Sequence, residues 1–292
     1  MIIVQLIGGL GNQMFQYAAG CSLAVHHNTE LKLDTTQCCQ DKLRDCDLSV
    51  FSITANVALS MDLDRVRRPL TWNIKHPVGS LRTVIRQNAT IRYVKERNFY
   101  FDPDIIALPN NIYLEGYWQS EKYFAEITDI IKKEFSFVNP PSKINREIIE
   151  EIRGCNSVSL HIRRGDYVSN PIAKEILGVL GIEYYMHALN FIESKIENPH
   201  IFVFSDDIQW ARENLKTTLP LRFINHNRME MDYEDLRLMS NCKHHVIANS
   251  SFSWWGAWLD NNYNKIVIAP KSWFNTKSLD SKDLIPNEWI KL

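Results

Sequence analysis

The sequence predicts an α/β protein built from two parallel-sheet domains. Its first residues have the pattern of a strand, a glycine turn, a helix and a second strand, and its second half alternates strands with amphipathic helices. Pro140-Pro141 lies between these halves, and a double proline is typical of a linker or a helix start. We therefore expect an N-terminal domain over residues 1–139 and a C-terminal domain over residues 140–292.

The N-terminal segment predicts a strand, a turn, a helix and a strand in that order. Residues 2–6 form an apolar run typical of a buried strand, and residues 8–11 contain three glycines. Asn12 is the expected N-cap of the following helix, and residues 30–34 predict the next strand. Backbone N–H groups at such a helix start could bind a phosphate or a sugar, and a tight turn without a ligand is the alternative.

The same turn invites a dinucleotide interpretation. Gly9 and Gly11 have the G-x-G spacing, and Asp34 ends the second strand where a ribose-binding acid would lie. Met14 occupies the position of the third glycine, and its bulk would hold the helix and strand apart. A nicotinamide-dependent oxidoreductase therefore stays an alternative with an incomplete motif.

Residues 40–100 are the least regular part of the chain. Nine Lys or Arg residues stand against three Asp or Glu residues between Met61 and Arg97. A solvated basic face explains this excess, and a surface for anionic lipid or a lipid-diphosphate acceptor is the functional alternative. Asp102-Pro103-Asp104 has the D-x-D form of some metal-nucleotide sites, but its proline favours a turn that opens a helix.

Residues 112–124 are rich in aromatic and hydrogen-bonding side chains. Glu115, Tyr117 and Trp118 lie in this stretch. Aromatic rings next to amides and carboxylates suit sugars, which have apolar faces and hydroxyl rims. We expect these three residues on the acceptor side of a sugar site. A strand followed by an amphipathic helix also explains the stretch.

The second half predicts a doubly wound parallel domain. Its expected elements are a helix over 144–152, a strand over 157–162, a helix over 182–196, a strand over 200–205, a helix from 208, a strand around 222–224, a helix over 232–241, a strand over 245–248, a helix over 252–259 and a strand over 266–269. Ligands in such domains bind beyond the carboxyl ends of the strands.

Polar clusters follow three of these strands, over residues 161–166, 205–207 and 249–253. If the strands are neighbours, the clusters converge. Arg163 and Arg164 would then suit a diphosphate, because guanidinium groups bind phosphate oxygens in a bidentate manner. Asp206 could pair with the N1 and N2 donors of guanine, and hydroxyl and N–H groups at Ser251 could complete the cage. A solvated Arg-Arg turn with an Asp salt bridge is the structural alternative.

Composition bounds the class of partner. The formal net charge is −1, which creates no field that favours nucleic acid. Six cysteines form no C-x-x-C pair, so neither a zinc site nor a redox motif is expected. No run approaches the roughly 20 apolar residues of a membrane span, and the first residues lack a basic region. We expect a cytoplasmic chain, with association at the inner membrane face left open by the basic stretch.

Four motifs resemble those of the α-1,2-fucosyltransferases of glycosyltransferase family 11. They are the H-x-R-R-G-D-Y run at 161–167, the glycine-rich run at 8–17, F-S-D-D at 204–207 and the N-S-S-F-S-W-W-G-A-W run at 249–258. The resemblance extends from residue 1 to residues 286–290, and residues 40–100 match least.

This resemblance implies a GT-B architecture, in which two Rossmann-like domains face a central cleft. It implies inverting transfer of L-fucose from GDP-fucose to the 2-hydroxyl of a terminal galactose, without a metal or other cofactor. The acceptor would be a galactose-terminated oligosaccharide, and a lipid-linked form of it stays open.

The resemblance also implies roles for individual residues. Arg163 would neutralise the charge that develops on the β-phosphate, and Arg164 would hold the diphosphate or orient its loop. Asp166 is the first candidate for the base that takes the acceptor proton, and Glu115 is the second. Asn12 would reach the sugar or phosphate from the first domain. The expected donor-binding residues are Gly9, Gly11, Asn12, Gln13, His161, Arg163, Arg164, Asp206, Asn249, Ser250, Ser251 and Phe252.

Two other classes compete with this interpretation. An oxidoreductase would use Gly9, Gly11 and Asp34 but would leave the arginines without a task. A non-enzymatic adhesion module would use Arg164-Gly165-Asp166 as an R-G-D tripeptide, which requires an exposed loop on a secreted protein.

Overall fold

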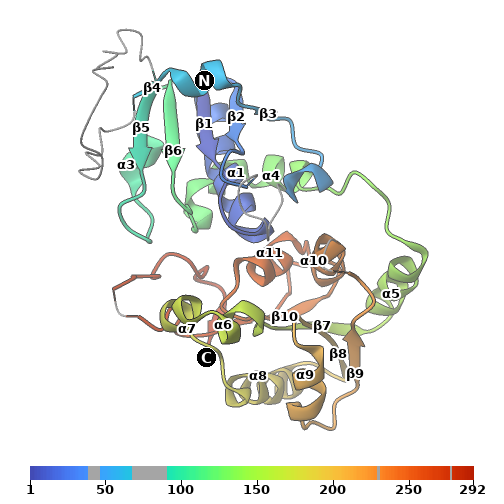
Figure 1. The fold of residues 1–292 in the computed structure, drawn as a ribbon. Helices are drawn as coiled ribbons and strands as arrows, with labels where there is room; N and C mark the ends of the chain where they lie inside the picture. The colour runs from blue at the N-terminus through green and yellow to red at the C-terminus, as the bar shows by residue number, and fades with distance from the viewer. Residues whose placement is uncertain (39–46, 68–90, 229–230, 277) are drawn as a thin grey trace.

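The structure is a computed structural model that describes residues 1–38, 47–67, 91–228, 231–276 and 278–292. Two α/β regions lie one above the other, and helices α1 and α11 meet at their junction (Figure 1). Each region contains one six-stranded sheet whose strands all pair in parallel. The prediction of two parallel-sheet regions is confirmed.

The N-terminal sheet has the strand order β3-β2-β1-β6-β5-β4. Its strands are β1 (Ile2–Gln5), β2 (Leu31–Asp34), β3 (Asn56–Val57), β4 (Val66–Arg67), β5 (Ile91–Lys95) and β6 (Ile112–Glu115). The helical elements of this part of the chain are α1 (Leu10–His26), η2 (Asp47–Val50), α2 (Ser60–Asp64), α3 (Pro103–Ile106), η3 (Glu121–Tyr123), η4 (Ala125–Ile127) and α4 (Thr128–Glu134).

The C-terminal sheet has the strand order β12-β11-β10-β7-β8-β9. Its strands are β7 (Asn156–Ile162), β8 (Pro199–Ser205), β9 (Leu221–Ile224), β10 (His244–Val246), β11 (Val267–Ala269) and β12 (Ile290–Lys291). The helices are α5 (Lys143–Arg153), α6 (Gly165–Ser169), α7 (Pro171–Leu177), α8 (Ile182–Lys195), α9 (Ile208–Asn214), α10 (Asp232–Ser240) and α11 (Ser251–Leu259).

The central strands are buried on both faces, whether their sequence is an apolar run, as in β1, or alternates polar and apolar residues, as in β7. All four residues of β1 are buried, and so are six of the seven residues of β7. Parallel strands with helices on both faces need apolar side chains on both sides of the sheet. The boundary expected at residues 139 and 140 lies between α4 and α5, and therefore between the last strand of one sheet and the first strand of the other.

One local prediction is wrong. Helix α1 begins at Leu10 with Gly9 as its N-cap, so Asn12 lies within the first turn and does not cap the helix. After β7, the chain forms the short helices α6 and α7. Gly165 is needed for space, because a Cβ atom there would lie 2.6 Å from Asp206 Oδ2.

The junction between the two regions is a close contact of α1 with α11. A Cβ atom on Gly11 would lie 2.5 Å from the backbone nitrogen of Phe252. Trp255 donates its indole N–H to the carbonyl of Gly11 at 3.0 Å, and the ring of Phe15 lies 4.4 Å from that of Trp254. The glycine turn and the tryptophan-rich motif are therefore parts of one packed interface, although they are far apart in the sequence.

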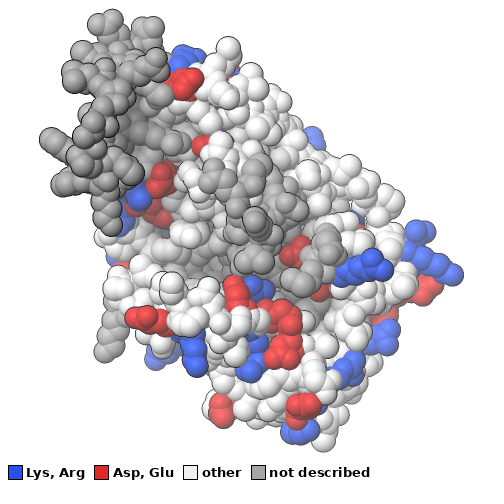
Figure 2. Space-filling model, in the orientation of Figure 1, with Lys and Arg blue, Asp and Glu red and all other residues white. Residues whose placement is uncertain are grey.

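Both charge signs are present on the face of the molecule shown in Figure 2. Figure 2 shows Lys and Arg side chains interspersed with Asp and Glu on the visible face. Among the described residues, no helix has the length and apolar character needed to cross a membrane. Residues 68–90, most of the basic stretch interpreted as a solvated face with a lipid-facing surface as the alternative, lie outside the described residues.

Candidate active site

Three polar clusters converge at the carboxyl edge of the C-terminal sheet. Strands β10, β7 and β8 are consecutive neighbours, and each ends in one of the predicted clusters. The segment after β7 carries the two arginines, the segment after β8 carries Asp206 and Asp207, and the segment after β10 leads into α11. The predicted convergence is confirmed.

Arg163 lies between two carboxylates. Its Nη2 atom is 2.8 Å from Asp166 Oδ1, and its Nη1 atom is 3.1 Å from Asp206 Oδ2. Burial opposes the charged guanidinium, but Asp206 and Asp166 outweigh that effect and raise the pKa of Arg163 above its usual value. The guanidinium is thus permanently charged and held in one orientation from two sides.

Arg164 is fixed by a different set of contacts. Its backbone N–H donates to Asp206 Oδ1 at 2.8 Å, and its Nε atom lies 3.1 Å from Asp207 Oδ2. The guanidinium lies over the ring of Trp210 at 4.0 Å, a favourable cation–π distance. Arg164 was predicted either to hold the diphosphate or to orient its loop. These contacts agree with the second role, and the first stays a prediction.

The electrostatic balance differs from that expected of two free arginines. Asp166, Asp206 and Asp207 contribute three negative charges next to the two positive ones. Both oxygens of Asp206 are engaged by the arginine segment, so its predicted pairing with guanine would compete with these contacts. That pairing stays a prediction.

His161 and Asn249 provide buried polar atoms beside the arginines. Burial, with a smaller contribution from Arg163, lowers the pKa of His161 to about 3, so the imidazole is neutral. Its ring lies 5.8 Å from that of Phe252. His161 Nδ1 and Asn249 Oδ1 are buried and make no hydrogen bond within the described part of the chain. Native proteins leave few such atoms unpaired, so these two are candidate ligand contacts.

Asn249 is itself held in place from both sides. Its Nδ2 atom donates to the carbonyls of Leu177 and Trp273, at 2.8 and 3.1 Å. The hydroxyl of Tyr167 donates to the Asn249 carbonyl at 3.0 Å. These bonds fix the side-chain oxygen of Asn249 relative to the arginine segment.

Asn12 connects the two domains. The hydroxyl of Ser251 and the amide of Gln119 both donate to Asn12 Oδ1, each at 2.7 Å. Asn12 therefore contacts the second domain, and its predicted reach toward the sugar or phosphate stays a prediction. Ser250 is the N-cap residue of α11, and its hydroxyl makes no capping bond.

Gln13, an expected donor-binding residue, lies beside the glycine turn. It is completely buried, and its Nε2 atom donates to the carbonyl of Gly8 at 2.9 Å. Its amide therefore supports the glycine turn from within the first domain. Gly9 and Gly11 contribute the helix start and the close contact with α11.

The acceptor-side candidates separate into three environments. Glu115 accepts a hydrogen bond from Tyr93 at 2.6 Å and lies 2.8 Å from Lys95 Nζ. Tyr117 is 36% exposed and its ring lies 5.9 Å from that of Phe99. Trp118 is only 1% exposed, so the expectation that its ring offers a face to a sugar is wrong. The Trp118 side chain is instead part of the hydrophobic core, where its ring meets that of Tyr123 edge-on at 5.7 Å.

Sequence reasoning missed Glu96, which lies directly after β5. Its two carboxylate oxygens accept the backbone N–H groups of Tyr117 at 2.6 Å and Trp118 at 3.0 Å. Burial raises its pKa to about 7, against the lowering effect of these two hydrogen bonds. The sequence offered little sign of Glu96, because β5 lies in the least regular stretch of the chain. Gly116, whose missing side chain leaves room for Glu96, was the only signal.

The D-x-D tripeptide opens a helix, as predicted. Asp102 is the N-cap of α3, and its carboxylate accepts the N–H of Asp104 at 3.0 Å. Within the described ranges, no three His, Cys, Asp or Glu side chains are grouped as metal ligands would be. Metal independence stays a prediction.

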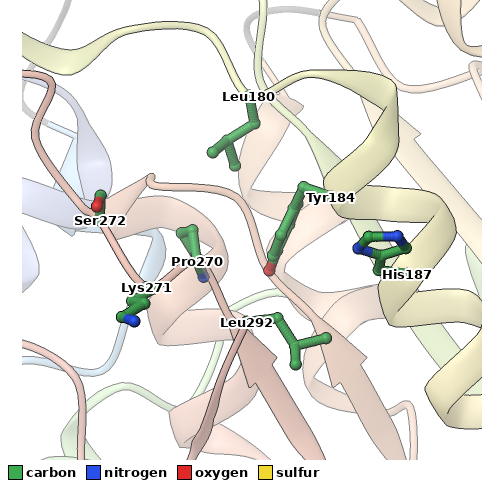
Figure 3. Close-up of a pocket in the computed structure, with 7 residues that line it drawn as sticks. All are labelled: Leu180, Tyr184, His187, Pro270, Lys271, Ser272 and Leu292. Atoms are coloured by element: carbon green, nitrogen blue, oxygen red, sulfur yellow. The ribbon is translucent and has the colours of Figure 1, made fainter.

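A separate cavity of about 370 Å³ lies beside helix α8 (Figure 3). It is lined by Leu180, Tyr184, His187, Pro270, Lys271, Ser272 and Leu292. The Tyr184 hydroxyl donates to the carbonyl of Ile247 at 2.7 Å, just after β10. None of the predicted donor-binding residues lines this cavity.

Two alternative classes conflict with the observed contacts. Asp34, the residue an NAD site would use, is completely buried, and it accepts bonds from the Tyr113 hydroxyl at 2.6 Å and from Thr36 N at 3.0 Å. The R-G-D tripeptide lies at the start of α6, and both of its charged side chains are paired with other residues of the site. Neither feature is arranged as its alternative function requires.

Fold and site together define a glycosyltransferase of the GT-B class, with two parallel α/β domains and polar clusters at their junction. The α-1,6-fucosyltransferase NodZ soaked with GDP-fucose has a similar structure, with a TM-score of 0.51, 12% identity and coverage of 88% of this chain and 92% of that chain. A variant of FUT1 from Arabidopsis thaliana in complex with GDP gives a TM-score of 0.50 at 9% identity, covering 98% and 74% of the two chains.

The chain belongs to glycosyltransferase family 11. The sequence profile of Glycosyl transferase family 11 matches residues 69–292. An α-1,2-colitosyltransferase from Escherichia coli is 35% identical over 100% of this chain and 99% of its own length. The O-antigen glycosyltransferase WbnK from the same species is 33% identical over 98% and 99%. Human galactoside α-(1,2)-fucosyltransferase 1 is 24% identical over 61% of this chain and 51% of its own length.

Proposed function

We propose that this protein is a galactoside α-1,2-fucosyltransferase, which moves L-fucose from GDP-fucose to the 2-hydroxyl of a terminal galactose with inversion. Family membership supports a glycosyl transfer reaction. Similarity to the human galactoside α-(1,2)-fucosyltransferase supports the sugar and the linkage. Structural similarity to NodZ soaked with GDP-fucose supports the fold on which such a donor can bind.

The arrangement of Arg163 carries the proposal. In the reaction, the bond between fucose C1 and the β-phosphate oxygen breaks, and its electron pair stays on the phosphate. A fixed positive charge next to that oxygen stabilises the transition state more than the ground state. Arg163 has this character because Asp166 and Asp206 hold its guanidinium from two sides.

The neighbouring residues would bind the rest of the donor. His161 is neutral and buried, so its unpaired Nδ1 can contact a donor group without adding charge. Asn249 Oδ1 offers a second buried acceptor. Asn12 and Ser251 would close the site from opposite domains, since they already share a hydrogen bond. No metal or other cofactor is required in this proposal, because the arginine supplies the charge.

GDP-colitose is the alternative donor. The E. coli relative named as an α-1,2-colitosyltransferase is 35% identical over the whole chain, which is closer than the human fucosyltransferase. Colitose is fucose without its 3-hydroxyl, so a single polar contact to that hydroxyl would decide between the two donors.

The test is a transfer assay with purified protein, GDP-fucose or GDP-colitose, and a panel of β-galactosides with different reducing-end sugars, including a lipid-linked member. We expect fucose transfer to a terminal galactose, with the new bond at O2 and the α configuration by NMR. Exclusive transfer of colitose would show that GDP-colitose, rather than GDP-fucose, is the donor. Absence of transfer from both donors, with GDP bound normally, would refute the proposed reaction.

A further inference from the structure

We propose that Glu96 is the general base that takes the proton from the acceptor hydroxyl. This inference rests on the proposed function. In the step, the acceptor oxygen forms a bond to C1 of the donor sugar while the bond from C1 to the phosphate oxygen breaks. The electron pair of the broken bond stays on the phosphate, and the hydroxyl proton moves to the Glu96 carboxylate. The geometry at the carboxyl edge of the N-terminal sheet points to this residue.

Glu96 is held in a defined position. Its backbone N–H donates to the carbonyl of Glu115 at 2.8 Å, which extends the pairing of β5 with β6. Its side chain then lies over the turn after β6, with one oxygen on each of two successive backbone N–H groups. A Cβ atom on Gly116 would lie 2.4 Å from Glu96 Cβ. Only glycine at 116 therefore leaves room for the carboxylate.

The turn that holds Glu96 has features common at functional sites. Trp118 adopts a left-handed backbone conformation with φ of 57°, which is costly for a bulky residue and persists only where surrounding contacts enforce it. Its indole Nε1 is buried and makes no hydrogen bond to any described residue. The strain orients the N–H groups of residues 117 and 118 toward the Glu96 oxygens.

The same turn lies at the domain junction. Gln119, the next residue, donates to Asn12 Oδ1, and Ser251 donates to that same oxygen from the other domain. Beyond Glu96, the ring of Phe99 meets that of Phe274 at 4.7 Å, edge to face. The segment carrying Glu96 thus contacts the C-terminal domain, which also carries Arg163.

This placement matches the requirement of a single inverting displacement. The departing phosphate and the incoming hydroxyl lie on opposite faces of the sugar carbon. Arg163 belongs to the C-terminal sheet edge, and Glu96 belongs to the N-terminal sheet edge. A donor bound at the first edge would present its other face to the second.

The two carboxylates expected from the sequence are less suited to this task. Asp166 lies 2.8 Å from Arg163 Nη2, and Glu115 lies 2.8 Å from Lys95 Nζ. Each of these carboxylates is already engaged in an ion pair, which an acceptor hydroxyl would have to displace. Within the described ranges, no Lys or Arg forms an ion pair with Glu96, whose oxygens meet only backbone N–H groups.

The protonation behaviour of Glu96 agrees with the geometry. Burial raises its pKa to about 7, which suits a base that works near neutral pH. Tyr123 is the titratable side chain that faces it, and the charge of Glu96 adds to the effect of burial in raising the pKa of Tyr123. The backbone N–H groups of Tyr117 and Trp118 are the remaining polar groups around the carboxylate.

The decisive experiment compares Glu96→Gln with the parent in steady-state fucose transfer, with Glu126→Gln as a control on an exposed carboxylate of the same domain. We expect Glu96→Gln to lower kcat by about 10²–10⁴-fold, the range for general base catalysis, with the Kd for GDP unchanged. The parent kcat should rise with pH through about 7, and the residual activity of the variant should lack this limb. Glu126→Gln should behave as the parent.

Parental kcat in folded Glu96→Gln, or a retained pH limb, would overturn the inference. Because Glu96→Gln could also loosen the turn, Glu96→Asp is measured in parallel. It keeps a carboxylate that is drawn back by one methylene, and we expect a kcat between those of the parent and Glu96→Gln with the pH limb preserved. Loss of this limb in folded Glu96→Asp would equally overturn the assignment. If the parent transfers no fucose, the proposed function fails first, and the two failures are thereby distinguished.

Discussion

The carboxyl edges of the two sheets carry the same residue types in opposite electrostatic settings. At the C-terminal edge, Asp166, Asp206 and Asp207 are each within ion-pair distance of an arginine. At the N-terminal edge, the Glu96 oxygens meet two backbone N–H groups and, within the described residues, no Lys or Arg, and burial raises the pKa of Glu96 to about 7. A carboxylate therefore orients a cation at one edge and is free to exchange a proton at the other.

The comparison shows how the backbone can divide two tasks between chemically similar side chains. Ion pairs favour the charged form of both partners, which suits groups that must stay charged while the phosphate leaves. Burial beside neutral hydrogen-bond donors can raise the pKa of a carboxylate toward neutral pH, so that it can gain and lose a proton there. Substitutions at either edge can break this division.

Arg163→Ala should lower kcat by about 10²–10³-fold, because one preorganised donor to a developing negative charge has this value. Arg163→Lys should also fail, since lysine keeps the charge but cannot contact Asp166 and Asp206 together. The measurements are kcat and KM for GDP-fucose, with melting temperatures as the folding control. A folded lysine variant with most of the parental rate would show that charge alone suffices at this edge.

Asp206→Ala should weaken GDP binding by about 1.5–3 kcal/mol, the value of a hydrogen bond to a charged group. Both Asp206 oxygens also contact the arginine segment, and a loss that acts only through that segment would weaken GDP and inosine diphosphate, which lacks the 2-amino group, equally. Calorimetry with both nucleotides decides. Selective weakening of GDP would instead support direct pairing of Asp206 with guanine.

Gly11→Ala should destabilise the protein by about 1–3 kcal/mol, as overpacking does elsewhere. Its Cβ atom would lie 2.5 Å from backbone atoms of residues 251 and 252 and would push the two edges apart. Gly154→Ala is the matched control, because Gly154 has a helical backbone that alanine adopts readily. Chemical denaturation measures both. Equal stability of the two variants would argue against a tight contact of α1 with α11.

His161 should make the protein less stable in acid. Its pKa is lowered from 6.5 to about 3 in the fold, so between these pH values the unfolded chain binds a proton that the folded chain does not. Unfolding is favoured as pH falls below 6.5, by at most about 1.4 kcal/mol per pH unit. His161→Gln removes this term. As the pH is lowered from 6.5, the unfolding free energy of the parent should decrease more than that of His161→Gln. A difference between the two proteins that does not change with pH would contradict a buried neutral imidazole.

Chelation should have the smallest effect. Because Arg163 supplies the positive charge at the phosphate, we expect transfer in EDTA to equal transfer in Mg²⁺ within about twofold, well below the loss expected when one donor to the phosphate charge is removed. The assay compares initial rates after dialysis against EDTA and after addition of Mg²⁺ or Mn²⁺. Activity lost in EDTA and restored by the metal would refute the metal-free prediction.

Much of the architecture followed from local patterns. The apolar run that begins at Ile2 predicted a buried strand, because a side chain in a covered parallel strand meets a helix on either side. The clusters at residues 161–166, 205–207 and 249–253 followed from the rule that strand ends share one edge. Those features depend on short segments, so the sequence contains them directly.

The sequence by itself determined the two-sheet α/β fold, the motifs of the family and the arginine cluster as a candidate site. Only the tertiary structure decided which carboxylates are neutralised and which is left to exchange a proton. Asp166 and Glu96 are both acidic residues near a strand end, and no local pattern separates them. The difference arises because Arg163 lies beside one, and a buried turn of backbone N–H groups lies beside the other. Counter-charge and burial are set by residues distant in the chain, and these two quantities control the pKa of a carboxylate.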